Sequence, residues 1–290
     1  MTMPLVGRAL APRASAPHRD AGTASPSVGD AAPPPAVEAL GRSAGRGVAL
    51  VVAFWWLATG VLIALERDTG TRLLALALVA ICAPTGLLLV ARAGRRTTPG
   101  GAVESFLGGS LLWTAAAGAL YGGWIVGVVD TGPAPGTIAL TVQAMLATWY
   151  NDAFTLLLGV AAWWLVRHGP NRVGVTTLLV FWLVHAIAKV NVFVGVANPG
   201  AHYLPDYLWH LQRYFGPERN SLLLPATVVA LVAATLALAW RARRAADAWR
   251  RTEAALLATI LALSVLETGV LGVAFDAGAW DVFLRLRGGP

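Results

Sequence analysis

Seven apolar stretches of about 20 residues follow one another along this chain, and they constrain its fold more than any other feature. A hydrophobic run of that length is typical of a helix that crosses a bilayer. Of the 290 residues, 57% are hydrophobic and only 13% are charged, whereas soluble domains carry about 25% charged residues. We therefore expect an all-α, multi-pass membrane helix bundle. Its seven transmembrane helices are predicted at residues 48–65, 73–91, 103–129, 138–166, 173–197, 222–240 and 254–275.

The arginines predict how the seven spans are oriented. Cytoplasmic loops of membrane proteins carry the excess of basic residues, and here the alternating loops divide the boundary arginines into twelve and six. This places the N-terminus in the cytoplasm and the C-terminus in the periplasm of a bacterial inner (cytoplasmic) membrane. The twelve are Arg42, Arg46, Arg92, Arg95, Arg96, Arg167, Arg172, Arg241, Arg243, Arg244, Arg250 and Arg251, and the six are Arg67, Arg72, Arg213, Arg219, Arg285 and Arg287.

The two ends of the chain differ from the membrane domain at 48–275. Residues 1–47 contain seven prolines among many alanines, glycines and serines, a composition typical of a disordered tail, which we expect in the cytoplasm. No apolar run suited to a signal peptide is found there. A start codon assigned too early would also explain this stretch. Residues 276–290 are expected to form a short periplasmic tail.

The longest external loop, at 198–221, has helical periodicity. Leu204, Leu208, Leu211 and Phe215 recur at helical spacing, Pro205 suits a first helical turn, and Tyr203 and Tyr214 add aromatic residues of the kind that gather at membrane interfaces. We predict an amphipathic helix at about 203–215, lying in the outer interface. The alternative is a loop packed over the bundle.

Lys189 is the only lysine of the chain, and it lies inside the fifth predicted span. A cation near the middle of a spanning helix costs about 2.5–3.5 kcal/mol on insertion scales, so it requires a partner or a function. Asp152 and Glu267 are predicted near the middle of spans four and seven, at similar depth. His185 lies four residues before Lys189 on one face, whereas Asn191 lies on nearly the opposite face. We therefore predict an intramembrane polar cluster of these five residues, with span five near the centre of the bundle.

Several roles for this cluster remain open at this stage. Buried ion pairs can simply fix helix register and the choice of neighbours. The same groups can handle protons or a substrate, or they can contact a pigment or a lipid. A single buried histidine such as His185 is more often hydrogen-bonded in a core than a ligand.

The sequence contains no motif for a reaction. It has no nucleotide-binding loop, no His-Glu-x-x-His pattern and no histidine–carboxylate cluster at metal spacing, so we expect neither a catalytic residue nor a metal site. A retinal protein is not expected, because the lysine of that family lies in the last helix, whereas Lys189 lies in the fifth predicted span. Nucleic acid is not expected as a partner, because the arginines lie at membrane boundaries.

Two glycine pairs, Gly118–Gly122 and Gly123–Gly127, predict close helix packing in span three.

The chain from residue 48 onward resembles the PuhE family of photosynthetic complex assembly proteins. The residues that carry the resemblance are Gly169-Pro170-Asn171-Arg172-Val173-Gly174, the stretch from Ala188 to Val196, Leu204-Pro205, Leu208, Leu211, Tyr214-Phe215, Asn220, Pro225, Leu266-Glu267 and the opening Trp55-Trp56 with Thr59-Gly60. Lys189, Asn191 and Glu267 match the residues of the family's pattern at these positions. Its His-Glu, His-Glu and Glu-His pairs are replaced here by Tyr121-Gly122, Asn151-Asp152 and Glu267-Thr268.

The resemblance implies a non-catalytic role in assembling the reaction centre–light-harvesting complex, linked to bacteriochlorophyll supply. Reaction-centre or light-harvesting subunits and pigment-synthesis enzymes would be its partners, beside the lipid bilayer. No cofactor is expected, and a bacteriochlorophyll contact has no ligand residues to support it. The alternative function is a small secondary transporter or proton-coupled permease that uses Lys189, Asp152 and Glu267. Against it, the chain has no internal repeat of the kind that transporters show.

Overall fold

The computed structural model describes residues 70–124, 137–201, 204 and 206–274, together with isolated positions at 45, 49, 51, 52, 61 and 65. The described residues form helices and no strands, which confirms the all-α prediction. Apart from those isolated positions, the first predicted span (48–65) and both predicted tails (1–47 and 276–290) lie outside the described residues. The elements are α2 (Arg72–Ala93), α3 (Pro99–Tyr121), α4 (Thr137–Val166), α5 (Val173–Val194), the 3-10 helix η2 (Asp206–Tyr214), α6 (Leu223–Arg244) and α7 (Ala248–Leu271).

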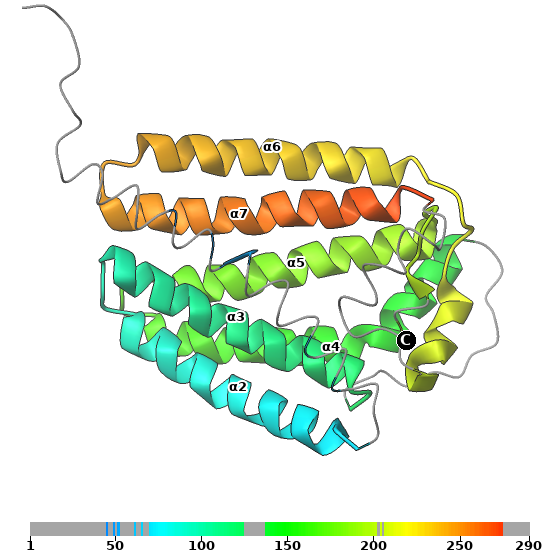
Figure 1. Cartoon of the computed structure of the whole chain (residues 1–290), viewed down its shortest axis with the longest axis horizontal. Coiled ribbons are helices and arrows are strands. Elements are labelled where there is room, and N and C mark those ends of the chain that lie inside the picture. Colours follow the sequence, from blue (N-terminus) through cyan, green and yellow to red (C-terminus); the bar gives the residue numbers. More distant parts are fainter. Residues whose placement is uncertain are drawn as a thin grey trace, which may run out of the picture.

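Four of the described helices, α2, α5, α6 and α7, are long and apolar enough to cross a membrane. The chain is therefore a membrane protein. The helices run roughly along one direction, with α6 on one side of the bundle, α2 on the other, and α7, α5, α3 and α4 between them (Figure 1).

Helix α3 lies among other helices of the bundle. It packs against α2, α4, α5 and α7, and 15 of its 23 residues are buried. A helix covered by other helices has no need of large apolar side chains toward lipid. It benefits instead from small residues, which allow neighbouring backbones to come close.

Close helix contacts occur at glycines other than the predicted pairs. A Cβ at Gly86 would lie 2.8 Å from the carbonyl oxygen of Gly108, and a Cβ at Gly109 would collide with the carbonyl oxygen of Gly174. Helix α3 therefore touches α2 through one glycine and α5 through the next. The predicted pair Gly118–Gly122 lies at the very end of α3, and Gly127 lies outside the described residues.

Several helices begin or end at other residues than the predicted spans, and two of the ends are followed by a glycine with a positive φ. Helix α3 ends at Tyr121 instead of continuing to residue 129, and Gly123 has a positive φ of 71°. Helix α5 ends at Val194 because Gly195, with a φ of 132°, turns the chain away. Positive φ values of this kind favour glycine. Helix α7 begins six residues earlier than expected, at Ala248, and ends at Leu271.

Asn171 ties together two turns at one end of the bundle. Its side-chain amide faces the carbonyl oxygens of Ala93, Arg96 and Gly101 at 3.0–3.1 Å, and its backbone N–H donates to the carbonyl oxygen of Gly94 at 3.0 Å. Asn171 is fully buried. The turn between α4 and α5 is thereby fixed against the turn between α2 and α3.

Neighbouring residues of the same turn complete this junction. The side-chain oxygen of Asn171 accepts a hydrogen bond from the backbone N–H of Val173 at the start of α5. The backbone N–H of Gly174 donates to the hydroxyl of Ser105 on α3 at 2.8 Å. A Cβ at Gly169 would collide with the carbonyl oxygen of Gly94. The Gly-Pro-Asn-Arg-Val-Gly stretch at 169–174 thus has a structural role.

The same end of the bundle is rich in arginine. The turns from α2 to α3, α4 to α5 and α6 to α7 all lie there (Figure 1), and ten of the thirteen arginines in the described part belong to this arginine-rich end. Three of them lie over tryptophan rings, Arg167 on Trp164, Arg244 on Trp240 and Arg250 on Trp249. Arg72, Arg213 and Arg219 lie at the opposite end.

At that opposite end, Asn220 joins the ends of α5 and α7. Its side chain accepts a hydrogen bond from the backbone N–H of Ala197 at 2.9 Å and donates to the carbonyl oxygen of Gly272 at 2.7 Å. The backbone N–H of Asn198 donates to the carbonyl oxygen of Leu271. The loop from α5 to α6 is therefore bonded to the bundle rather than free.

The segment predicted as an interfacial helix forms a 3-10 helix that packs on the bundle. Its place in the outer membrane interface stays a prediction. Leu208, Leu211 and Tyr214 are 1%, 7% and 2% exposed. They pack against Ala144 and Ala147 of α4 and Phe193 of α5, with Leu204 and Phe215 partly buried beside them. The buried positions recur every three residues, the period of a 3-10 helix. Tyr203 and Pro205 lie outside the described residues.

We expect Asn171→Ala to lower the free energy of unfolding by about 3 kcal/mol, because several buried backbone carbonyls lose their donor. Thermal unfolding of the detergent-purified protein, followed by tryptophan fluorescence, measures the loss. Asn198→Ala is the matched control, because its side-chain oxygen accepts a single long hydrogen bond, from the N–H of Gly200 at 3.3 Å. Equal melting temperatures for the two variants would contradict the structural role of Asn171.

Packing of η2 is tested by two substitutions one residue apart. Leu208→Ala should cost about 2–5 kcal/mol, as for a large buried side chain truncated in a core. Trp209→Ala should cost no more than about 0.5 kcal/mol, because Trp209 is 57% exposed. The same unfolding assay distinguishes them. A larger cost for Trp209→Ala would indicate that the aromatic face, rather than the leucine face, holds this segment in place.

Candidate intramembrane ion-pair site

Lys189 and Asp152 form an ion pair between α5 and α4. The Nζ atom of Lys189 lies 2.7 Å from Oδ2 of Asp152, and the two side chains are 9% and 16% exposed. Asp152 occupies the middle of α4, and Lys189 lies five residues before the end of α5. A buried cation therefore has a carboxylate directly against it, which removes most of the cost of placing it among apolar side chains.

Neighbours on the same two helices supply further hydrogen bonds to the pair. The indole N–H of Trp182 donates to Oδ1 of Asp152 at 3.0 Å, and the ammonium of Lys189 donates to the hydroxyl of Thr148 at 3.3 Å. Each carboxylate oxygen of Asp152 thus accepts one bond. An ion pair with its other atoms satisfied in this way is a stable arrangement inside a protein.

The local sequence explains why these groups meet. Thr148 and Asp152 are four residues apart on α4, and Trp182 and Lys189 are seven apart on α5, so each pair shares one helix face. The two helices are antiparallel neighbours joined by the turn that Asn171 fixes. That short turn sets how far one helix can slide against the other.

His185 lies on α5 near the ion pair but packs with aromatic rings. Its ring meets Trp113 edge-on at a centroid distance of 5.2 Å, and Trp113 stacks on Phe181 at 5.9 Å. The Nε2 atom of His185 is buried and has no hydrogen-bond partner among the described residues. The structure therefore places His185 in the contact between α5 and α3.

Asn191 lies on a different face of α5 and bonds a different helix. Its side-chain amide donates to the hydroxyl of Thr227 on α6 at 3.1 Å and to the carbonyl oxygen of Ile187 at 2.9 Å. Asn191 is fully buried. It joins α5 to α6. Helix α5 packs against α3, α4, α6 and α7. The predicted polar residues of α5 therefore take part in separate helix contacts and do not form one cluster.

The structure does not bring Glu267 into the ion pair. Glu267 is exposed and lies four residues before the end of α7. The sequence predicts it near the middle of a span at 254–275. The helix begins and ends earlier, so Glu267 lies four residues from its end, about as far as Lys189 lies from the end of α5. Depth therefore does not separate the two residues, and the difference is that the Glu267 side chain is exposed.

Sequence reasoning missed Trp182, Thr227 and Asn171. The seven-residue spacing from Trp182 to Lys189 was a usable signal, because it puts a hydrogen-bond donor on the face of the lysine. Thr227 and Asn171 gave no comparable signal, because their partners are 36 and 70 or more residues away in sequence. The described residues contain no group of three or more His, Cys, Asp or Glu side chains that could hold a metal ion.

The fold and the site together define an all-helical membrane protein whose central helices are joined by a buried ion pair and by buried asparagines. The chain belongs to the family described as "Protein of unknown function (DUF3623)", which it matches over residues 43–285. It is 34% identical over 108 residues to a Rhodobacter capsulatus protein described as "Uncharacterized 30.4 kDa protein in puhA 5'region". That match spans 36% of this chain and only 38% of the relative. No solved structure matches the chain.

A double-mutant cycle tests whether Lys189 and Asp152 act as a pair. Lys189→Met and Asp152→Leu should each cost about 3–5 kcal/mol, because each leaves one buried charge without its partner. The double variant should cost much less than the sum, because it leaves two apolar side chains. Thermal unfolding in detergent and abundance in the membrane measure the three variants.

Glu267→Gln combined with Lys189→Met is the control cycle. Because Glu267 is exposed on another helix, the two costs should add to within about 0.5 kcal/mol. Coupling to Glu267 as large as the coupling to Asp152 would contradict the pairing described above.

Proposed function

We propose that this protein is an assembly factor of the PuhE type for the reaction centre–light-harvesting complex, acting by helix–helix contact in the bacterial inner membrane. The observation that carries the proposal is the relative described as lying in the puhA 5' region of Rhodobacter capsulatus. We take that region to be part of a photosynthesis gene cluster. The resemblance to the PuhE family at 169–174 and 188–196 points to the same role. Partners would be reaction-centre or light-harvesting subunits, or enzymes of bacteriochlorophyll synthesis.

The geometry is compatible with a scaffold. Within the described residues, most side chains of the predicted intramembrane polar cluster join helices to each other. Lys189 is bonded to Asp152 and Thr148, and Asn191 to Thr227. Groups used in this way rigidify a bundle. A rigid bundle with large apolar faces suits the reversible binding of other transmembrane helices. Action without catalysis and without a cofactor remains a prediction.

For the membrane topology we propose seven spans, with the first at 48–65, the N-terminus in the cytoplasm and the C-terminus in the periplasm. The concentration of ten arginines at one end of the described bundle supports the orientation, because that end would face the cytoplasm. The Arg–Trp contacts at this end suit a membrane boundary, where tryptophan and arginine both gather.

Deletion of the gene from its host tests the function. We expect the near-infrared absorption of the membranes, which reports assembled pigment–protein complexes, to fall or to develop late under phototrophic growth. Dark growth and membrane potential should be unchanged. Complementation with the wild-type gene should restore the absorption, and so should the Lys189→Met/Asp152→Leu double variant if the ion pair acts only in structure.

Two results would contradict the proposal. Unchanged complex formation in the deletion strain would remove the assembly role. A defect in solute uptake or in membrane potential in dark-grown cells, restored by the wild type but not by the double variant, would favour a transporter that uses Lys189 and Asp152. A position of the gene beside reaction-centre or bacteriochlorophyll genes in its own genome is the simplest first observation.

A further inference from the structure

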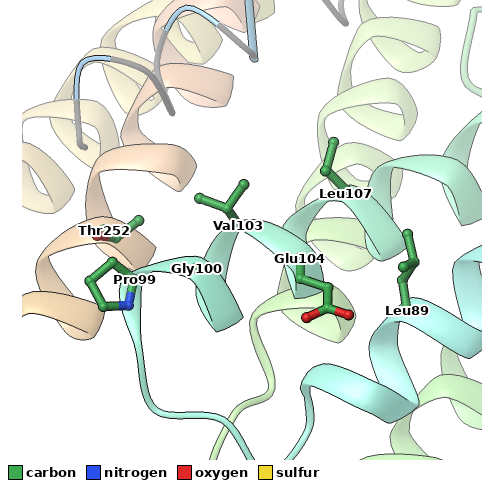
Figure 2. A pocket seen from close by; sticks show the side chains of 7 residues that line it. All are labelled: Leu89, Pro99, Gly100, Val103, Glu104, Leu107 and Thr252. Carbon is green, nitrogen blue, oxygen red and sulfur yellow. The ribbon is translucent and has the colours of Figure 1, made fainter. Parts of the chain in front are cut away.

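An apolar groove opens on the side of the bundle near the arginine-rich end. It lies between the end of α2, the first turns of α3 and the beginning of α7 (Figure 2). Its volume is about 350 Å³, and its lining is mostly apolar, with Leu89, Gly100, Val103 and Leu107 beside Thr252. This volume is at the lower end of the range for ligand pockets, so it suits part of a slender ligand.

A charged group borders the groove on the side of α2. Glu104 lines the groove and forms ion pairs with two arginines, with Nη1 of Arg96 and, at 3.5 Å, with Nε of Arg92. The arginine side chains are 64% (Arg92) and 55% (Arg96) exposed, whereas that of Glu104 is 17% exposed. One carboxylate faces two guanidinium groups, so one positive charge at this border is left uncompensated.

We propose that the groove binds an anionic phospholipid, with an acyl chain along Leu89, Val103 and Leu107 and the headgroup phosphate at Arg92 and Arg96. An apolar groove in a membrane protein calls for an apolar ligand, and the adjoining positive charge calls for an acidic one. Guanidinium groups bind phosphate oxygens in bidentate fashion. Basic pockets between helices at the cytoplasmic side of membrane proteins bind anionic lipid headgroups.

Charge complementarity favours a lipid over an acidic protein segment. An acidic peptide would neutralise the arginines but would leave the apolar lining of the groove uncovered. A zwitterionic lipid would fill the groove but would bring no net charge to the border. Only an amphiphile with a negative headgroup meets both requirements.

Glu104 adjusts the strength of this binding. Its carboxylate occupies the same guanidinium groups that the phosphate requires, so lipid and carboxylate compete for Arg92 and Arg96. Removing the negative charge while keeping the shape, as in Glu104→Gln, leaves both arginines available to the phosphate. The structure thus predicts a variant that binds the lipid more tightly than the wild type.

Native mass spectrometry of the detergent-purified full chain, mixed with equal amounts of phosphatidylglycerol and phosphatidylcholine, tests the site. We expect the wild type to retain phosphatidylglycerol about tenfold more than phosphatidylcholine. The Arg92→Gln/Arg96→Gln variant should lose about tenfold in phosphatidylglycerol retention together with the preference, because the headgroup phosphate loses both guanidinium partners. Glu104→Gln should raise retention. Arg243→Gln/Arg244→Gln, at the same end but on α6, is the matched control and should behave as wild type.

Filling the groove gives a second test that leaves its charges unchanged. Gly100 lines the groove, and a Cβ there meets no atom within 4 Å, so Gly100→Leu fits the backbone and occupies the groove. It should lower retention of both lipids several-fold. Gly269→Leu is the matched control, because a Cβ at Gly269 on α7 also meets nothing within 4 Å. Similar melting temperatures establish that the variants are folded.

Three outcomes would overturn the proposal. The first is equal retention of the two lipids by the wild type. The second is an equal loss in the Arg243→Gln/Arg244→Gln control, which would mean that general surface charge attracts the lipid. The third is binding of a soluble poly-glutamate peptide that depends on Arg92 and Arg96 but is unaffected by Gly100→Leu, which would assign the arginines to a protein partner.

Discussion

The need to neutralise one ammonium group among apolar side chains governs how α4 and α5 are placed. Lys189 can be buried because Asp152 lies 2.7 Å away, and Asp152 is held in turn by the indole of Trp182. A shift of either helix by one turn, about 5.4 Å, would separate the charges and leave both without a partner. The ion pair therefore selects one register among those that the apolar side chains alone would permit, since apolar contacts are not directional. Neighbouring helices then pack against a pair whose relative position is already fixed.

Helices α2 to α7 were predictable from the sequence because long apolar runs favour helices, and four of the six are long and apolar enough to cross a membrane. The pairing of Lys189 with Asp152 followed from depth, since both residues lie well inside their spans. The placement of Glu267 did not follow, because apolar runs give the approximate depth of a residue but not the helix face it occupies, and Glu267 is exposed. Helix ends depend on caps and on turns such as Gly195, whose positive φ no hydropathy pattern reveals.

Two further differences between the predicted and the observed structure also arise from tertiary contacts. The glycines that matter for packing, Gly108 and Gly109, face different helices, and a search for Gly-x-x-x-Gly pairs passes over them. A broader pattern of small residues, Gly101, Ser105 and Gly109 at four-residue spacing, would have identified the face toward α5. For η2, the same leucines fit both an α-helical and a 3-10 period. Only the contact with Ala144, Ala147 and Phe193 decides between them.

The junction at Asn171 has a consequence for how the chain enters the membrane. The carbonyl oxygens of Ala93, Arg96 and Gly101 belong to the first hairpin of the described bundle, yet their donor is synthesised about seventy residues later. Until residue 171 is made, those carbonyls lack the side-chain donor that joins this turn to the next one, although Ala93 already accepts a hydrogen bond from the N–H of Arg96. The α2–α3 turn therefore reaches its final hydrogen bonding only after the α4–α5 turn has been translated.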